Sequence, residues 1–103
     1  MRCLDNHHHY HLINFEDENT FQPLIFIRKE PISADSTKLK TIHDGTTSEE
    51  VLEMLIHRLN GLNQKIPCRE NAIAITHCET ALLFLQKRTN NRKTRGVEGK
   101  QIA

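Results

Sequence analysis

The feature that most constrains this chain is a pair of amphipathic segments that meet at a proline, within residues 44–95. Apolar side chains between Val51 and Ile66 recur at three- and four-residue spacings, which predicts one helix. Pro67 ends that helix, because the residue before a proline avoids the helical region of backbone space. A second apolar stretch follows over residues 72–85. The sequence therefore predicts an antiparallel helical hairpin with Pro67 at its apex.

The start of the first helix is marked by a capping box. The Thr47 hydroxyl is expected to accept the amide of Glu50, whose carboxylate reaches back to the cap N–H. Gly61 lies inside the same helix, where glycine costs roughly 1 kcal/mol relative to alanine. Gly61 indicates either that another backbone segment approaches closely there or that the helix simply tolerates a glycine at this position.

The apolar residues of the second helix are too continuous for a helix that faces one partner. An apolar run around a helix implies burial on more than one side, and we interpret it as an oligomer interface. The alternative is a helix buried only by its own sheet and its hairpin partner. A chain of 103 residues has a modest core, and many such chains complete it by oligomerising.

The hairpin register leads to a candidate anion site. With Pro67 as the apex, the residue opposite Thr47 is near position 87, so Arg88 should stand beside the loop of residues 45–47, give or take a turn. Arg92 and Arg95 follow on the same face. Free N–H groups at a helix start, close approach at Gly45 and guanidinium forks together predict a small phosphate pocket. The alternative is an arginine cluster that complements the helix dipole, with Arg88 paired to Glu49 or Glu50.

The N-terminal half alternates as strands do. Residues 10–15, 21–29 and 37–43 are predicted strands of an antiparallel meander of two or three strands. Pro23 places the second at a strand edge or start. We expect an α+β fold in one domain over residues 1–103: a His-containing segment (1–9), a β-meander (10–43), the hairpin (44–95) and a tail (96–103).

No catalytic constellation is evident. His57 and His77 lack a nucleophile at fixed spacing, Cys68 has no supporting motif, and we expect no enzyme, cofactor or metal site. His7, His8 and His9 near Cys3 could hold a metal ion, but their spacing fixes no tetrahedral geometry. We interpret residues 1–9 as a mobile tract or a chance run of histidines.

Charge and composition exclude further classes. The formal net charge of +1 is too small for a general nucleic-acid coat. Three cysteines without a secretion signal indicate reduced thiols. No apolar run is long enough to span a bilayer, so we expect a soluble protein in the compartment where it is made. Basic residues concentrate in positions 87–100.

Three motifs carry a resemblance to a known family. The string DGTTSEEVLEMLIHRLNGLNQKIPCRENAIAIT (44–76), followed by KRTNNRKTRGVEG (87–99), resembles the phage Thoeris anti-defence sponge proteins and their anti-CBASS relatives. The resemblance covers about half the chain. The strand segments YHLINFE and FIRKEP are similar to those of the Thoeris branch.

The resemblance implies that the protein binds and sequesters a ligand without changing it chemically. Such proteins bind cyclic nucleotide immune signals, namely glycocyclic ADP-ribose isomers and cyclic di- or trinucleotides, in the cytoplasm of the infected bacterium. They are similar in forming homo-oligomers, dimers or hexamers, with shared sites. Carried over by motif, Arg88 and Arg92 would grip phosphates, Asn71 would contact the nucleotide, and Gly45, Thr46 and Thr47 would line a site with Arg88.

One departure from the family pattern concerns the first helix. Relatives tend to carry an aromatic residue where this chain has Gly61, so a base platform is expected to be missing there. The alternative function is a small nucleic-acid-binding or regulatory module that uses the basic end of the second helix.

Overall fold

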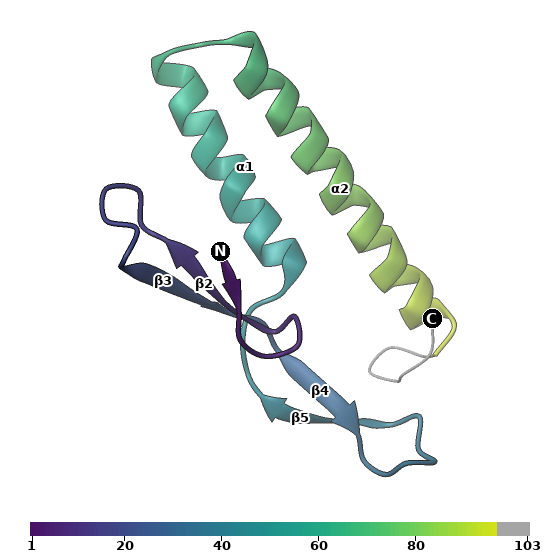
Figure 1. The fold of residues 1–103 in the computed structure, drawn as a ribbon. Helices are drawn as coiled ribbons and strands as arrows, with labels where there is room; N and C mark the ends of the chain where they lie inside the picture. The colour runs from purple at the N-terminus through teal and green to yellow at the C-terminus, as the bar shows by residue number, and fades with distance from the viewer. Residues whose placement is uncertain (97–103) are drawn as a thin grey trace. The chain divides into compact units, whose positions relative to one another are not determined.

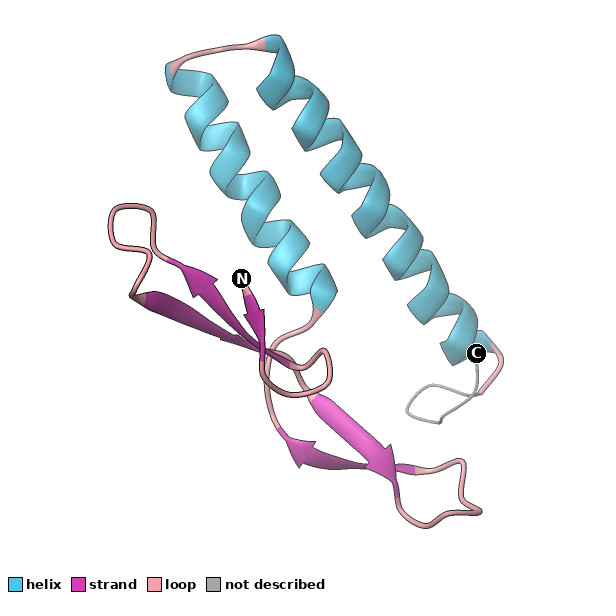
Figure 2. Ribbon diagram, in the orientation of Figure 1, coloured by secondary structure: helices cyan, strands magenta, loops and turns pink. Residues whose placement is uncertain are grey.

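The computed structural model describes residues 1–96, which form strands followed by two long helices (Figures 1 and 2). The strands are β1 (Arg2–Cys3), β2 (His9–Ile13), β3 (Phe21–Ile25), β4 (Arg28–Pro31) and β5 (Leu39–His43). The helices are α1 (Ser48–Lys65) and α2 (Arg69–Thr94). The predicted α+β class, with antiparallel strands before a helical hairpin, is confirmed. The predicted tail lies, from residue 97 on, outside the described residues.

The chain groups into two compact units that divide after Thr47. The N-terminal unit contains all five strands and residues 44–47, which the sequence had assigned to the hairpin. The second unit begins at Ser48 and contains α1 and α2. The expectation of a single domain stays a prediction.

The strands form two antiparallel sheets, not the single meander predicted. β1, β2 and β3 lie side by side in that order, and β4 pairs with β5. The predicted strand 21–29 is wrong in its continuity, because the ladder changes partner at its centre. The Phe26 N–H donates to the His8 carbonyl at 2.7 Å and the Ile27 N–H donates to the Thr46 carbonyl at 2.9 Å. These two residues therefore separate β3 from β4.

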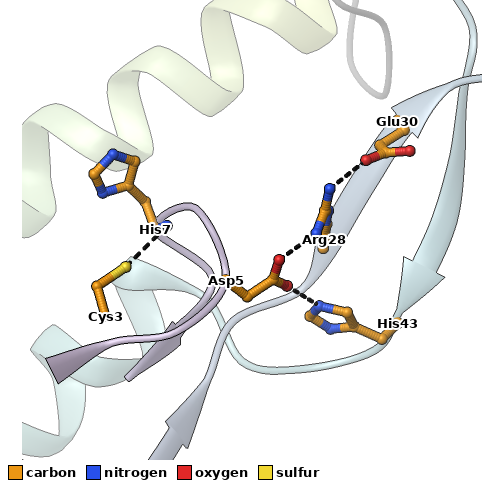
Figure 3. Close-up of polar contacts among 6 residues, drawn as sticks. All are labelled: Cys3, Asp5, His7, Arg28, Glu30 and His43. Atoms are coloured by element: carbon orange, nitrogen blue, oxygen red, sulfur yellow. Dashed lines mark hydrogen bonds and ion pairs between the residues drawn. The ribbon is translucent and has the colours of Figure 1, made fainter. Parts of the chain in front are cut away.

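Of the two interpretations of residues 1–9, a mobile tract or a chance run of histidines, the structure disagrees with the first. β1 pairs with β2 through Arg2 opposite His11 and Cys3 opposite Tyr10. The turn between them has positive φ at Asn6 and His7, and the His7 N–H donates to Cys3 Sγ at 3.2 Å (Figure 3). The described residues contain no group of three side chains suited to hold a metal ion.

Asp5, in that turn, joins the first sheet to the second. One carboxylate oxygen accepts from the Arg28 guanidinium and the other lies 2.9 Å from His43 Nε2 (Figure 3). Arg28 also contacts Glu30. The His43 hydrogen bond, aided by the charges of Arg28, His43 and His8, holds the pKa of the Asp5 carboxyl below its ordinary value.

This depressed pKa predicts a dependence of stability on pH. A carboxyl that prefers its charged form in the folded state contributes stability above its unfolded pKa, which is lost as pH falls through its folded value. We expect the N-terminal unit to lose stability below about pH 4, and Asp5→Asn to weaken it at neutral pH while flattening that dependence. Thermal unfolding at stepped pH measures both. Asp35→Asn, an exposed aspartate, is the matched control, and an equal effect there would contradict this role for Asp5.

The hairpin follows the helix signals of its sequence. α1 begins directly after Thr47, at the predicted cap position, and has Glu49 and Glu50 in its first turn. α2 begins after Cys68, whose backbone is extended and whose Sγ accepts from the Asn71 N–H at 3.4 Å. It ends at Thr94 with Arg95 as its C-cap, and Gly96, with φ of 70°, allows the chain to leave the helix. Neither helix in the described part of the chain is apolar and long enough to cross a membrane.

The helices share one narrow stripe of shielded side chains. On α2 these recur at alternating three- and four-residue spacings, as Asn71, Ile75, Cys78, Leu82, Leu85, Thr89 and Arg92. Ile75, 8% exposed, is the one described residue that is buried within a single chain. Large apolar groups lie outside the stripe, including Ile73, Leu83 and Phe84. One copy of the chain thus leaves much of its apolar surface uncovered.

Candidate functional site

The cationic end of α2 forms the strongest candidate site. A hollow of about 300 Å³ is lined there by Phe84, Lys87, Arg88, Asn91, Arg92 and Arg95. Among the described residues its wall contains four cations and no carboxylate. Guanidinium groups bind phosphate oxygens in pairs of parallel hydrogen bonds, so this surface is suited to an anion.

The arginine hollow, as we call this site, lies on one side of α2. Each residue turns a helix by about 100°, so Arg88 and Asn90 point about 200° apart. Asn90 lines a second hollow with Glu49, Gln86, Thr89 and Lys93, and a third with residues that include Phe84, Lys87 and Asn91. Beyond the second hollow, Glu53 and Glu79 line an open groove of about 600 Å³ with His57 and Leu83. Acidic side chains therefore gather on the other side of the hairpin.

The register of the hairpin can be read from these linings. Glu49 lies beside residues 86–93, and Glu53, His57 and Asn60 lie beside residues 79–86. The start of α1 is thus opposite the arginine-bearing end of α2, about one turn further along than the count from Pro67 predicted. The connection between the helices is extended at Cys68, with φ −149° and ψ 154°. Arg92 joins the stripe shared by the helices, whereas Arg88 lies about 100° from Thr89 on its flank.

The alternative explanation of Arg88 as a partner of Glu49 or Glu50 is not supported. Within residues 1–96, Arg88 makes no ion pair with either carboxylate. Arg95, by contrast, donates to the Asn91 side-chain oxygen at 3.4 Å. Arg88 thus presents a guanidinium whose donors are not taken up by its own hairpin.

The loop of residues 45–47 belongs to the N-terminal unit and is held there by its backbone. The Gly45 N–H donates to Asp44 Oδ1 at 2.9 Å, and the Thr46 N–H donates to the Ile25 carbonyl at 2.9 Å. These two amides, which the sequence offered to an anion, already have protein acceptors. The expected meeting of Gly45, Thr46 and Thr47 with Arg88 and a ligand stays a prediction.

Asn71 lies at the opposite end of the hairpin from the arginines. It stands in the first turn of α2, and seventeen residues separate it from Arg88, or about 26 Å of helix. One small ligand cannot touch both residues of the same chain. The three residues Asn71, Arg88 and Arg92 can therefore share a ligand only if two copies combine.

The other reactive side chains have structural contacts. Cys68 caps α2 through its sulfur, and its N–H donates to Asn63 Oδ1 at 3.0 Å. His57 lines the acidic groove. Sequence reasoning missed Phe84, which lies in the arginine hollow and could have been found as an aromatic residue one turn before Arg88.

Two comparisons with known proteins show what this chain is similar to. The family model described as the Acb2/Tad1 hairpin domain matches residues 24–90. The chain is also 49% identical, over 57 residues, to the protein named Thoeris anti-defense 1 from Bacillus phage SBSphiJ7. That alignment covers 54% of this chain and 40% of the phage protein, so the chain spans about two-fifths of the length of this relative. The family match includes Asn71 and Arg88 and ends two residues before Arg92.

Proposed function

This chain belongs to the Acb2/Tad1 hairpin family of Thoeris anti-defence proteins, and from that premise we propose that it binds cyclic nucleotide immune signals and keeps them from their receptors. The ligand class is glycocyclic ADP-ribose, cyclic di- or trinucleotides, or both. The place of action is the cytoplasm of a bacterium infected by a phage. The ligand is held and released unchanged, and this describes a binding protein, not an enzyme.

The arginine hollow is the observation that carries this proposal. The two phosphates of such a ligand carry negative charge. Arg88 and Arg92 stand one helical turn apart in the wall of the arginine hollow, whose described residues include no carboxylate. Each hydrogen bond to a charged group contributes roughly 1.5–3 kcal/mol, so two guanidinium forks can supply micromolar or tighter binding. The acidic groove on the other side of the hairpin would repel the same ligand.

We also propose that the working form is a homo-oligomer, a dimer or a hexamer. The distance of about 26 Å between Asn71 and Arg88 supports it, because only a second copy can bring Asn71 to the phosphates. The small core of one chain supports it as well, since Ile75 is the sole described residue that the chain buries by itself. Exposed Ile73 and Leu83 offer apolar area for such a contact.

The test is a calorimetric titration of the protein with two glycocyclic ADP-ribose isomers, a cyclic dinucleotide and a cyclic trinucleotide. We expect submicromolar binding of at least one ligand. Heat-denatured complex should release that ligand with its original mass and chromatographic retention. If no ligand binds, the proposal fails, and a cleaved product in the released fraction would contradict simple sequestration.

A nucleic-acid contact is the second candidate, because α2 concentrates Lys87, Arg88, Arg92, Lys93 and Arg95 near its end. Binding to a polymer releases many counterions and weakens steeply with salt, whereas a ligand with two phosphates responds less. A titration series between 50 and 200 mM salt, with the best ligand and with single-stranded DNA as separate probes, distinguishes the two. Tighter binding of the DNA at low salt, with no binding of the cyclic ligands, would favour the polymer.

A further inference from the structure

Phe84 is an exposed aromatic ring without an aromatic partner. Its side chain is 61% exposed, on the side of α2 away from the shielded positions Leu82 and Leu85. Of the other three phenylalanines, Phe21 and Phe26 have ring partners and Phe15, which is fully exposed, has none among the described residues. Phe21 stacks on His11 with centroids 3.7 Å apart, and Phe26 meets Tyr10 edge-on at 5.9 Å. The face of the Phe84 ring is therefore available to a planar group.

Phe84 stands in one row with the arginine hollow. Side chains four residues apart on a helix are neighbours, with Cβ atoms about 5–6 Å apart, so Phe84 adjoins Arg88 directly. Asn91 and Arg95 continue the row and are joined by a hydrogen bond, and Lys87, three residues after Phe84, is a second cation beside the ring. A ligand with a phosphate at Arg88 would carry its base within one helical turn of the ring.

We propose that Phe84 is the stacking platform for a nucleobase of the ligand whose phosphates bind Arg88 and Arg92. This inference rests on the proposed function and adds a specificity-determining residue to that site. The ring accepts any base with an exposed π-face, and it binds the larger surface of adenine better than a pyrimidine. By contrast, a bare phosphate or pyrophosphate gains nothing from Phe84.

Stacking on an aromatic side chain contributes enough to be measured. Loss of one stacked base corresponds to roughly a 10- to 100-fold loss of affinity. Because the ring is exposed and lies outside the shielded stripe, its removal leaves the fold of the hairpin intact. The effect of Phe84 on binding can thus be separated from any effect on folding.

The chain contains no tryptophan, which provides a direct optical test. In Phe84→Trp, the only indole stands in the arginine hollow, and its fluorescence reports a base stacked on it. We expect quenching that saturates as cyclic diadenylate is added, with the same midpoint as calorimetry of that variant. Inorganic pyrophosphate should leave the fluorescence unquenched. Absence of quenching while calorimetry shows tight binding of cyclic diadenylate would overturn the proposal.

Removal of the ring gives the second test. Phe84→Ala and Phe84→Leu should each bind cyclic diadenylate about 10- to 100-fold more weakly than the parent protein, with pyrophosphate affinity unchanged. Phe84→Leu keeps apolar area without a π-face, so a loss in both variants identifies stacking. Met54→Ala is the control, because Met54 is an exposed apolar residue of α1, 56% exposed, and lies outside the arginine hollow. It should bind as the parent protein does.

The outcomes separate this inference from the proposed function. If the parent protein binds no cyclic ligand, the proposed function fails and the stacking role fails with it. If the parent binds cyclic diadenylate and both Phe84 variants bind it equally well, only the stacking role is overturned. Light scattering completes the set: if Phe84→Ala changes the oligomer and loses pyrophosphate binding too, Phe84 is an assembly contact and the proposal is overturned.

Discussion

Arg88→Ala is expected to weaken binding of the cyclic nucleotide by about 100-fold or more. Removing one guanidinium fork deletes two charge-assisted hydrogen bonds to phosphate, worth roughly 3 kcal/mol together after compensation by water. Arg88 forms no ion pair within its described surroundings, so its removal leaves no protein group unsatisfied. The thermal stability of the protein should therefore stay within a degree or two while affinity falls. Calorimetric titration and thermal unfolding of the same sample measure both quantities.

Arg88→Lys separates geometry from charge. Lysine keeps the positive charge but offers a point donor instead of a planar fork, so most of the loss should persist if the contact is bidentate. The matched control is Arg58→Ala, an exposed arginine of α1 outside the arginine hollow. An equal loss of affinity in Arg58→Ala would show that general charge, not a defined pocket, holds the ligand. Arg92→Ala should resemble Arg88→Ala in affinity, with some loss of stability because Arg92 is half-buried.

The helical hairpin was predictable because its signals are local. Each signal acts within a few residues: the three- and four-residue spacing of Leu52, Leu55 and Leu59, the end of the helix before Pro67, and the capping pattern at Thr47. Their agreement placed both ends of α1 to within two residues of the structure. The same spacing placed Arg88 and Arg92 one turn apart, so the core of the candidate site followed from sequence alone.

The N-terminal unit was less predictable because its contacts are not local. An alternating run from Phe21 to Lys29 looks like one strand, but Phe26 and Ile27 bond to His8 and Thr46, which no short pattern reveals. Likewise, Asp5 meets His43 across thirty-eight residues. Gly45 has a contact of the same non-local kind. The absence of a side chain at Gly45 allows close contact with the backbone of residues 25–27, whereas its predicted approach to phosphate stays a prediction.

Gly45→Ala is expected to destabilise the N-terminal unit by about 2–4 kcal/mol. A Cβ at position 45 would lie 2.5 Å from the carbonyl carbon of Phe26 and 2.7 Å from both Ile25 O and Ile27 N. These are backbone atoms, which cannot swing aside as a flexible side chain can. The loop must move away, and the bonds from Thr46 N–H to Ile25 and from Ile27 N–H to Thr46, each 2.9 Å, are then broken. Hydrogen exchange of residues 21–47, followed with urea unfolding, measures the loss.

The control for Gly45→Ala is the same substitution at Gly61. A Cβ there meets nothing within 4 Å, and alanine is favoured over glycine in a helix by about 1 kcal/mol, so Gly61→Ala should stabilise the protein. Opposite signs for the two variants would establish that close backbone contact, not glycine content, decides the outcome. Gly45→Ala also displaces Thr46 and Thr47, so it should weaken the binding of any ligand that these two residues contact. This loss of affinity should parallel the loss of hydrogen-exchange protection. If Gly45→Ala kept full protection but lost affinity, Gly45 would instead act at the ligand itself, as its sequence motif first suggested.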